Sequence, residues 1–212
     1  AWAARWRTLR IGQGWSSDPE EDASYAAREA KRAIHLDRRN ALALATFGHV
    51  RAYMAGDYDT AIDYLDRAVA AGPNNAVARI LRSGTLSFLG RAEEARADAE
   101  KALRLSPFDE QLFQFYGFLA LACYAGGDFD RAVRWARRSL AENQNYTHTL
   151  KVLAVAQVAS GELDAAKSTV SLLLRKEPGF RTRRYRTGRA PFQDPARVTR
   201  LIERFEAAGV PA

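Results

Sequence analysis

The sequence predicts an all-α solenoid of stacked helical hairpins, and three observations lead to this fold class. A motif of the form G-D/R/E-x-x-x-A occurs four times along the 212 residues, and its closing alanines are separated by 34, 37 and 34 residues. Apolar residues follow each alanine with helical spacing, and no segment shows the alternation of a half-buried strand. A turn position, usually proline, lies twelve residues after each alanine, where proline ends a helix. We therefore predict helix pairs repeated in series.

The length of the repeat narrows this prediction further. A spacing of 34 residues is the period of the tetratricopeptide helix–turn–helix unit. Residues four and seven positions after each motif alanine are small or apolar, which places them on one helical face where two helices approach closely. These triplets are Ala61, Leu65 and Ala68; Ala95, Ala99 and Ala102; Ala132, Ala136 and Ser139; and Ala166, Val170 and Leu173. We predict a right-handed superhelical tetratricopeptide-repeat solenoid of about five hairpins with a C-terminal capping helix.

Taken in order, the expected units begin with a degenerate repeat and end with a cap. The units of the solenoid, residues 1–180, are a degenerate first repeat at 1–41 and then 42–75, 76–109, 110–146 and 147–180, with turn positions Arg38, Pro73, Pro107, Gln144 and Pro178. Their helices are expected at 2–10, 20–36, 41–55, 58–71, 76–89, 92–105, 109–125, 128–142, 147–160 and 163–176. Residues 181–212 are expected to form a basic linker and a capping helix that Asp194 caps and Pro195 starts. The apolar stripe of that helix would cover the last repeat, and its members are Val198, Leu201, Ile202 and Phe205.

Composition and charge exclude several classes of protein. Hydrophobic residues make up 47% and charged residues 27% of the chain, which fits a folded globular protein rather than a disordered one. No window of about 18 apolar residues exists, and the first residues lack the apolar core of a signal peptide, so we expect no membrane segment here and a cytoplasmic location. The sequence begins at Ala1, inside an expected helix, and we expect it to be part of a longer protein.

No residue pattern points to chemistry, and we expect no catalytic residue, no cofactor and no metal. Carboxylates gather at helix starts, where they favour the positive end of the helix dipole; they are Asp57, Asp59, Asp63, Asp128 and Asp130. A solenoid joins only neighbouring repeats, so we expect His49 and His148 to lie apart. The single cysteine, Cys123, excludes an internal disulfide, and its apolar surroundings favour an inert buried thiol. Loops that bind nucleotides are absent from the sequence.

The expected binding surface is the concave groove, which the first helix of each pair lines in arrays of this kind. The lining positions are mainly apolar, so we expect a helix or extended segment of a protein as partner, in cis or in trans. We leave open whether that partner is a second copy of the chain. The groove candidates are Thr46, Val50, Tyr53, Met54, Val77, Ile80, Phe88, Gln114, Phe118, His148, Lys151 and Val155.

An arginine-rich segment supplies the alternative function. The net charge is +7, and residues 175–212, with ten basic and four acidic residues, carry +6 of it. Arginines interleaved with Phe180 and Tyr185 have the composition of a polyanion-binding strip; they are Arg181, Arg183, Arg184, Arg186 and Arg189. Because the rest of the chain is close to neutral, we favour a structural linker over a nucleic-acid partner.

Four longer motifs carry a resemblance to a known family. They are GWSSDPEEDA at 14–23, FLGRAEEARADAEKALRLSPFD at 88–109, YAGGDFDRAVRWARRSL at 124–140, and APFQDPARVTRLIERFEAAGVP at 190–211. Their order resembles the C-terminal tetratricopeptide region of bacterial class III adenylate/guanylate cyclase-type regulatory proteins. The resemblance implies an accessory signalling module downstream of a cyclase or winged-helix domain. The chain departs from the repeat pattern at Arg38, His49 and Gln144, which puts local packing at these positions in question.

Overall fold

The computed structural model describes residues 1–187 and 191–212, apart from the side chain of Met54. Within these residues every regular element is a helix, as the sequence predicts. The helices are α1 (Trp2–Gly12), α2 (Pro19–Leu36), α3 (Ala41–Ala55), α4 (Tyr58–Ala71), α5 (Ala76–Phe88), α6 (Ala92–Leu105), α7 (Leu112–Ala125), α8 (Phe129–Glu142), α9 (Thr147–Ala159), α10 (Leu163–Lys176), α11 (Arg183–Arg186) and α12 (Pro195–Ala207).

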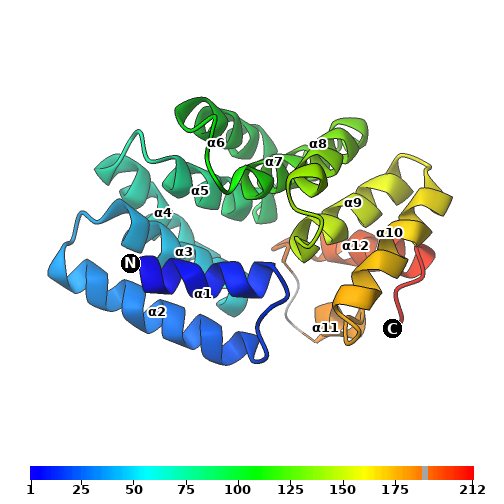
Figure 1. Ribbon diagram of the computed structural model, residues 1–212, viewed down its shortest axis with the longest axis horizontal. Helices are drawn as coiled ribbons and strands as arrows, with labels where there is room; N and C mark the ends of the chain where they lie inside the picture. Colours follow the sequence, from blue (N-terminus) through cyan, green and yellow to red (C-terminus); the bar gives the residue numbers. More distant parts are fainter. Residues whose placement is uncertain (188–190) are drawn as a thin grey trace.

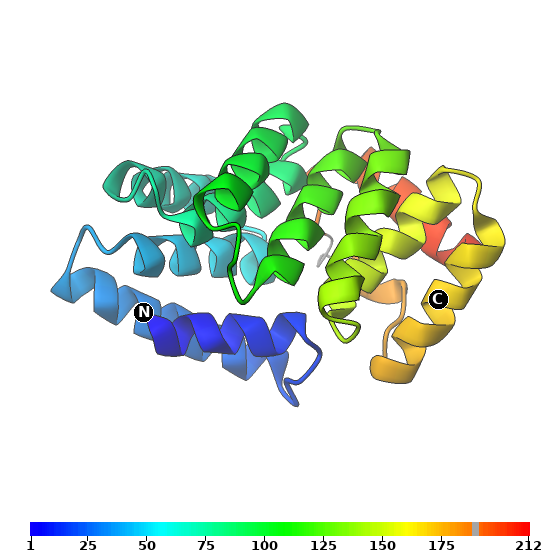
Figure 2. The same ribbon diagram turned by 45° about the horizontal axis from the view of Figure 1, so that its top comes forward.

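The helices from α3 to α10 form an arc of hairpins that curves around the centre of the molecule (Figure 1). Each hairpin packs its two helices together, as α3 packs with α4, and the first helices of successive hairpins also pack side by side, as α5 packs with α7. The arc is seen again when the molecule is turned (Figure 2). This is the predicted tetratricopeptide solenoid, with α3, α5, α7 and α9 on its inner side.

The predicted stripes of small residues form the seams between helices. All twelve of their side chains are buried, and the four motif alanines have no exposed surface. A larger side chain at such a position would overpack a seam that already has close-packed density. The predicted positions of the stripes are therefore confirmed.

The turns that follow the five hairpins share one backbone hydrogen bond, whether or not proline is present. In each turn the fourth residue donates its N–H to the carbonyl oxygen of the first; the pairs are Asn40 to Asp37, Asn75 to Gly72, Asp109 to Ser106, Tyr146 to Asn143 and Phe180 to Glu177. Asn40 and Asn75 also cap the following helix with their side chains. The departures at Arg38 and Gln144 therefore leave the turn geometry unchanged.

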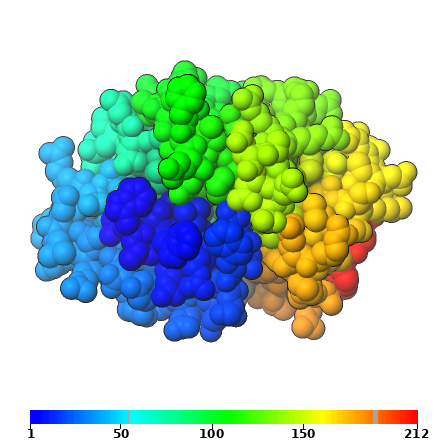
Figure 3. All heavy atoms as spheres, in the orientation of Figure 1, coloured from blue at the N-terminus to red at the C-terminus, as the bar shows by residue number. Residues whose placement is uncertain are grey.

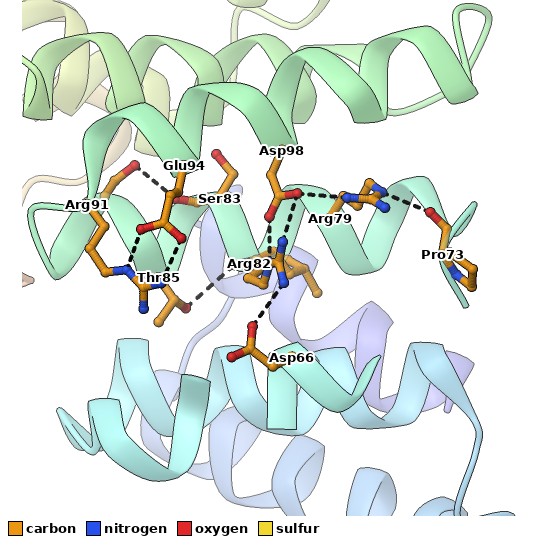
Figure 4. A network of polar contacts seen from close by, with 11 residues as sticks. Asp66, Pro73, Arg79, Arg82, Ser83, Thr85, Arg91, Glu94 and Asp98 are labelled. Carbon is orange, nitrogen blue, oxygen red and sulfur yellow. Dashed lines mark hydrogen bonds and ion pairs between the residues drawn. The ribbon is translucent and has the colours of Figure 1, made fainter. Parts of the chain in front are cut away.

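A polar network joins three consecutive helices, α4, α5 and α6 (Figure 4). Asp98 of α6 is buried and accepts hydrogen bonds from Arg79 and Arg82 of α5, at 2.9 Å and 2.6 Å. Arg82 also donates to Asp66 of α4 at 2.9 Å. Because a buried carboxylate needs paired donors, Asp98 fixes α6 against α5 within one hairpin, and the bond from Arg82 to Asp66 links that hairpin to α4.

Some helix boundaries differ from the prediction for local reasons. Helix α7 begins at Leu112 rather than 109, because the carboxylate of Asp109 accepts hydrogen bonds from Ser106 and from the backbone of Gln111 and so holds a turn there. Helix α2 begins at Pro19, because the side chain of Asp18 caps its first N–H groups. The short helix α11 was not predicted.

The C-terminal helix starts at Pro195, as predicted, but it packs against more of the molecule than the last repeat. Leu201, Ile202 and Phe205 are buried and Val198 is half-buried, so the predicted apolar stripe is indeed covered. The helix packs against α9, and Arg204 donates a hydrogen bond to the hydroxyl of Tyr124 on α7 at 2.7 Å. Helix α12 therefore returns along the inner side of the arc and does more than cover the last hairpin.

Candidate functional site

The concave side of the solenoid encloses a cavity of about 310 Å³. Its walls come from the inner helices, which contribute Tyr53, Phe88, Leu121, Tyr124 and Val155. Residues between Gly14 and Glu20 border it from the N-terminal side. The residues that border it from the C-terminal side are Arg184, Tyr185, Pro191, Phe192, Leu201 and Phe205. The groove expected from the sequence is therefore partly closed by both ends of the chain.

The C-terminal closure is aromatic. Phe192 packs against Phe88 and Tyr124, with ring centroids 6.1 Å and 6.3 Å apart. The backbone N–H of Gln193 donates to the carbonyl oxygen of Phe88 at 3.1 Å, and the Tyr58 hydroxyl donates to the carbonyl oxygen of Pro191 at 2.7 Å. Residues 191–193 thus occupy one end of the groove with one aromatic anchor.

The N-terminal closure is polar and depends on a buried arginine. Arg5 of α1 is 2% exposed, and its guanidinium donates hydrogen bonds to the side-chain oxygens of Gln114 and, at 3.2 Å, Gln111. Burial lowers the pKa of Arg5 to about 10. Thr147 donates its hydroxyl to the carbonyl oxygen of Gly12 at 3.2 Å. The first repeat therefore contacts the start of α7 and of α9, and Figure 3 shows the dark blue N-terminal residues lying against green and yellow-green ones.

The expectation that His49 and His148 lie apart is wrong. Both line a second cavity of about 30 Å³, and both pack on Phe118, at 5.8 Å and 5.1 Å between ring centroids. Burial lowers the pKa of His49 to about 3 and that of His148 to about 4. Two neutral imidazoles from repeats that are not adjacent therefore pack on the same ring of α7. The expectation considered only neighbouring repeats and left out the curvature of the superhelix.

An ion pair crosses the wall of the larger cavity beside these histidines. Lys151 of α9 donates to Glu177 at 2.9 Å, and its ammonium group lies 4.9 Å from the ring centroid of Phe180. Burial alone would raise the pKa of Glu177, but the charge and hydrogen bond of Lys151 lower it below its ordinary value. The groove wall therefore carries a neutralised pair rather than a free cation.

The predicted groove residues divide into three groups. Tyr53, Phe88, His148, Lys151 and Val155 line the larger cavity. Val50, Gln114 and Phe118 line the smaller one, together with Tyr53 and His148. Thr46 and Ile80 are wholly buried and Val77 is half-buried, and none of these three borders either cavity. The side chain of Met54 lies outside the described part of the structure.

The arginine-rich segment is only partly available to a partner. Arg186 pairs with Glu206 at 2.7 Å, and Arg181 donates to the backbone carbonyls of Pro178 and Phe180. Arg183 and Arg184 are exposed, and Arg184 lies over the rings of Phe180 and Tyr185. Arg189 lies outside the described residues.

The other titratable candidates have structural roles. Asp57 and Asp128 cap α4 and α8 with their side chains, as expected of carboxylates at helix starts. Cys123 is buried, and burial raises the pKa of its thiol to about 11. Among the described residues, no three His, Cys, Asp or Glu side chains gather in a way that would hold a metal ion. In the same part of the chain no helix is both long and apolar enough to span a bilayer.

Comparison with known proteins identifies the family. The sequence profile of the tetratricopeptide repeat matches residues 52–117 and 124–190, more than half of the chain. The chain therefore belongs to the tetratricopeptide repeat family, whose members generally act as non-catalytic scaffolds for protein–protein interaction.

Individual proteins and solved structures are also similar to this chain, at low sequence identity. The chain is 30% identical over 124 residues to the Protein STIP1 homolog of Dictyostelium discoideum, a match that covers 57% of this chain and 21% of that protein. Its fold is similar to the crystal structure of PilW, a widely conserved type IV pilus biogenesis factor, with TM-score 0.65, 18% identity and coverage of 97% and 87% of the two chains. It is also similar to TTC0263, a thermophilic TPR protein of Thermus thermophilus, with TM-score 0.65, 18% identity and coverage of 84% and 91%. These two likenesses concern the fold alone.

Three residues of the closed groove were not among the site residues predicted from the sequence. Arg5, Tyr124 and Phe192 make its closing contacts. Phe192 belongs to the PFQDP motif, and an aromatic residue inside a polar linker is a signal that could have marked it. No sequence signal separates Arg5 from the other arginines of the first helix.

Proposed function

We propose that the chain is a non-catalytic interaction module that holds an apolar protein segment in its concave groove. The observation that carries the proposal is the way residues 191–193 lie at one end of that groove. They combine one backbone hydrogen bond with one aromatic side chain packed between Phe88 and Tyr124. A partner segment with an aromatic or large aliphatic anchor would use the same contacts in trans.

Only some of the groove residues predicted from the sequence are accessible to such a partner. Tyr53 is 37% exposed, and His148 and Lys151 are half-buried at the larger cavity. Thr46 and Ile80 are wholly buried. The proposal assigns binding to the solenoid, residues 1–180, and closure of the groove to residues 181–212. The bound segment belongs to the same polypeptide, to another protein or to a second copy of the chain.

A peptide experiment tests the proposal directly. In the Phe192→Ala variant of the full chain one end of the groove is vacated, and a fluorescent peptide with the sequence of residues 191–197 serves as probe. We expect saturable binding by fluorescence anisotropy, weakened when the phenylalanine of the peptide is replaced by alanine and when Tyr53→Ala is added to the protein. Equal binding of both peptides, or none, would refute a groove that accepts apolar anchors.

A second part of the proposal concerns the protein around this module. The resemblance in the four long motifs supports a bacterial signalling protein of the adenylate cyclase type, acting in the cytoplasm. A segment bound in the groove would then shift the output domain between two states by its differential affinity for them. The sequence encoded upstream of Ala1 tests this part, and a cyclase or winged-helix domain there is the expected result.

The alternative function is binding of a polyanion through the arginine-rich segment. The exposed guanidiniums of Arg183 and Arg184 favour it. Phosphate binding weakens steeply with salt, whereas groove binding of an apolar segment does not. A salt titration with a single-stranded oligonucleotide and with the groove peptide therefore separates the two functions.

A further inference from the structure

A third hollow, outside the groove, is bordered by three arginines of α12. Arg197, Arg200 and Arg204 stand at positions i, i+3 and i+7, so they share one face of the helix. That face and the turn between α7 and α8 enclose about 250 Å³, with Tyr124, Phe129 and Phe192 as aromatic walls and Ala125, Gly126 and Gly127 as the remaining border. In Figure 1 helix α12 lies behind α9, on the inner side of the arc.

Two of the three guanidiniums are held in place. Arg204 donates to the hydroxyl of Tyr124 at 2.7 Å, and its guanidinium lies 5.3 Å from the ring centroid of Tyr124 and 4.7 Å from that of Phe129. Arg197 donates to the carbonyl oxygen of Ala125, also at 2.7 Å. A ligand that binds here therefore meets charges that are already oriented, which reduces the entropic cost of binding.

The charge of the hollow is only partly neutralised by the residues that the structure describes. Asp194 lies 3.7 Å from Arg197, and no other carboxylate of the described chain forms an ion pair with the three arginines. Arg200 is exposed and makes no hydrogen bond or ion pair within the described residues. Burial raises the pKa of the Tyr124 phenol, and all three arginines act in the opposite direction, as expected if their charges converge beside it.

We propose that this arginine hollow binds carboxylate side chains of an acidic protein segment. Guanidinium groups bind carboxylates with paired, charge-assisted hydrogen bonds, and the aromatic walls offer contact area for the aliphatic part of a Glu or Asp side chain. The site lies outside the cavity assigned to an apolar anchor, although both hollows share Tyr124 and Phe192 as walls. It therefore adds a separate, charged recognition element to the proposed function.

The surroundings favour a short acidic segment over a nucleic acid. Glu203, on the flank of the same helix, is exposed, and Asp128 and Asp130 lie at the start of α8, directly after the turn that borders the hollow. A nucleic acid repeats its charge at every residue and needs a continuous positive strip. A short segment with a few carboxylates can occupy the hollow without passing close to these acidic residues, whose charges would repel it.

A charge-reversal experiment on the full chain tests the proposal. The probe is a fluorescein-labelled hexaglutamate peptide, and the variant is Arg200→Glu, which removes no hydrogen bond or ion pair among the described residues. The matched control is Arg32→Glu on α2, an exposed arginine at the other end of the chain that gives the same change in net charge. Circular dichroism confirms that both variants are folded, and inorganic pyrophosphate and a 12-residue single-stranded DNA serve as competing probes.

We expect Arg200→Glu to raise the Kd of the hexaglutamate peptide about tenfold or more and Arg32→Glu to leave it within about twofold. An equal rise of the Kd in both variants would show that only the net charge of the protein matters, which would overturn the proposal. Absence of saturable peptide binding would overturn it as well. Tighter binding of the DNA than of the peptide, lost in Arg200→Glu, would assign the hollow to nucleic acid instead. None of these outcomes bears on the apolar groove, whose own test uses an uncharged anchor.

Discussion

Two regions close the same groove from opposite sides, and they do so with different chemistry. On the N-terminal side the buried guanidinium of Arg5 bonds to the side chains of Gln111 and Gln114. On the C-terminal side Phe192 and Phe205 pack against other aromatic rings. The hydrogen bonds of a buried charge require one geometry. When they break, buried polar groups are left without hydrogen-bond partners. Aromatic contacts are less directional, and an equivalent side chain from a partner can replace them.

This difference indicates on which side of the groove a partner can replace the contacts that the chain makes with itself. The polar closure is expected to behave as part of the fold, whereas the aromatic closure is expected to behave as a bound segment. Four experiments break or sharpen the comparison, and they are given in order of decreasing expected effect.

Removal of the whole C-terminal closure should have the largest effect. Truncation after Thr187 strips the apolar stripe of α12 from the groove, and each such side chain contributes roughly 1.5 to 3 kcal/mol when buried. We expect a lower melting temperature and association through the uncovered faces of α7 and α9, measured by calorimetry and analytical ultracentrifugation. A truncated protein that stayed monomeric, with unchanged hydrogen exchange in residues 147–176, would show that the tail is a free arm.

Loss of the polar closure should cost less but still affect the whole fold. Replacing Arg5 by Ala leaves a cavity and unpaired glutamine side chains, so we expect a loss of about 2 to 4 kcal/mol in the free energy of unfolding by urea. The matched control is Arg10→Ala, because Asp22 keeps its ion pair with Arg7. Similar urea midpoints for the two variants would mean that the bonds of Arg5 to Gln111 and Gln114 do not stabilise the position of α1.

The histidines behind the polar closure should make stability depend on pH. The folded pKa values of His49 and His148, about 3 and about 4, lie below the value of about 6.5 in an unfolded chain. Unfolding therefore takes up protons below pH 6.5. Stability is complete above that pH and declines as the pH falls toward the folded values, by about 1.4 kcal/mol per pH unit for each histidine.

Urea unfolding at pH 7 and pH 5 measures this dependence. The His49→Gln/His148→Gln double variant should lose much of the difference between the two pH values. His35→Gln, at an exposed position of α2, should keep all of it. An unchanged pH difference in the double variant would show that the two imidazoles are solvated in the folded protein.

A single aromatic contact of the C-terminal closure should give the smallest effect. In Phe192→Ala we expect faster hydrogen exchange within residues 191–212 and a fall of only about 1 kcal/mol in global stability, because a docked terminal segment opens locally. Phe108→Ala is the control, since Phe108 is 94% exposed in a turn. A large global loss would make this closure as structural as the polar one.

The sequence was sufficient for everything that depends on neighbouring repeats. The stripes at Ala95 and Ala132 and the cap at Asp194 follow from local periodicity, and the structure confirms them. The contacts of Arg5 and the packing of His49 and His148 on one ring depend on the curvature of the whole superhelix. Small rotations between successive repeats add up to that curvature, and no single repeat encodes it. Local pattern therefore predicted the hairpins but not the closed groove.

The same closures bear on the order in which the chain folds. A hairpin such as α5 with α6 joins residues close in sequence, whereas Asn143 donates a hydrogen bond to Gln13 across 130 residues and Tyr58 to Pro191 across 133. Loop-closure entropy makes such distant contacts costly until the intervening chain is ordered. The hairpins are thus expected to form first and the two closures last. A ribosome-bound chain would present the groove open until residues 191–205 emerge.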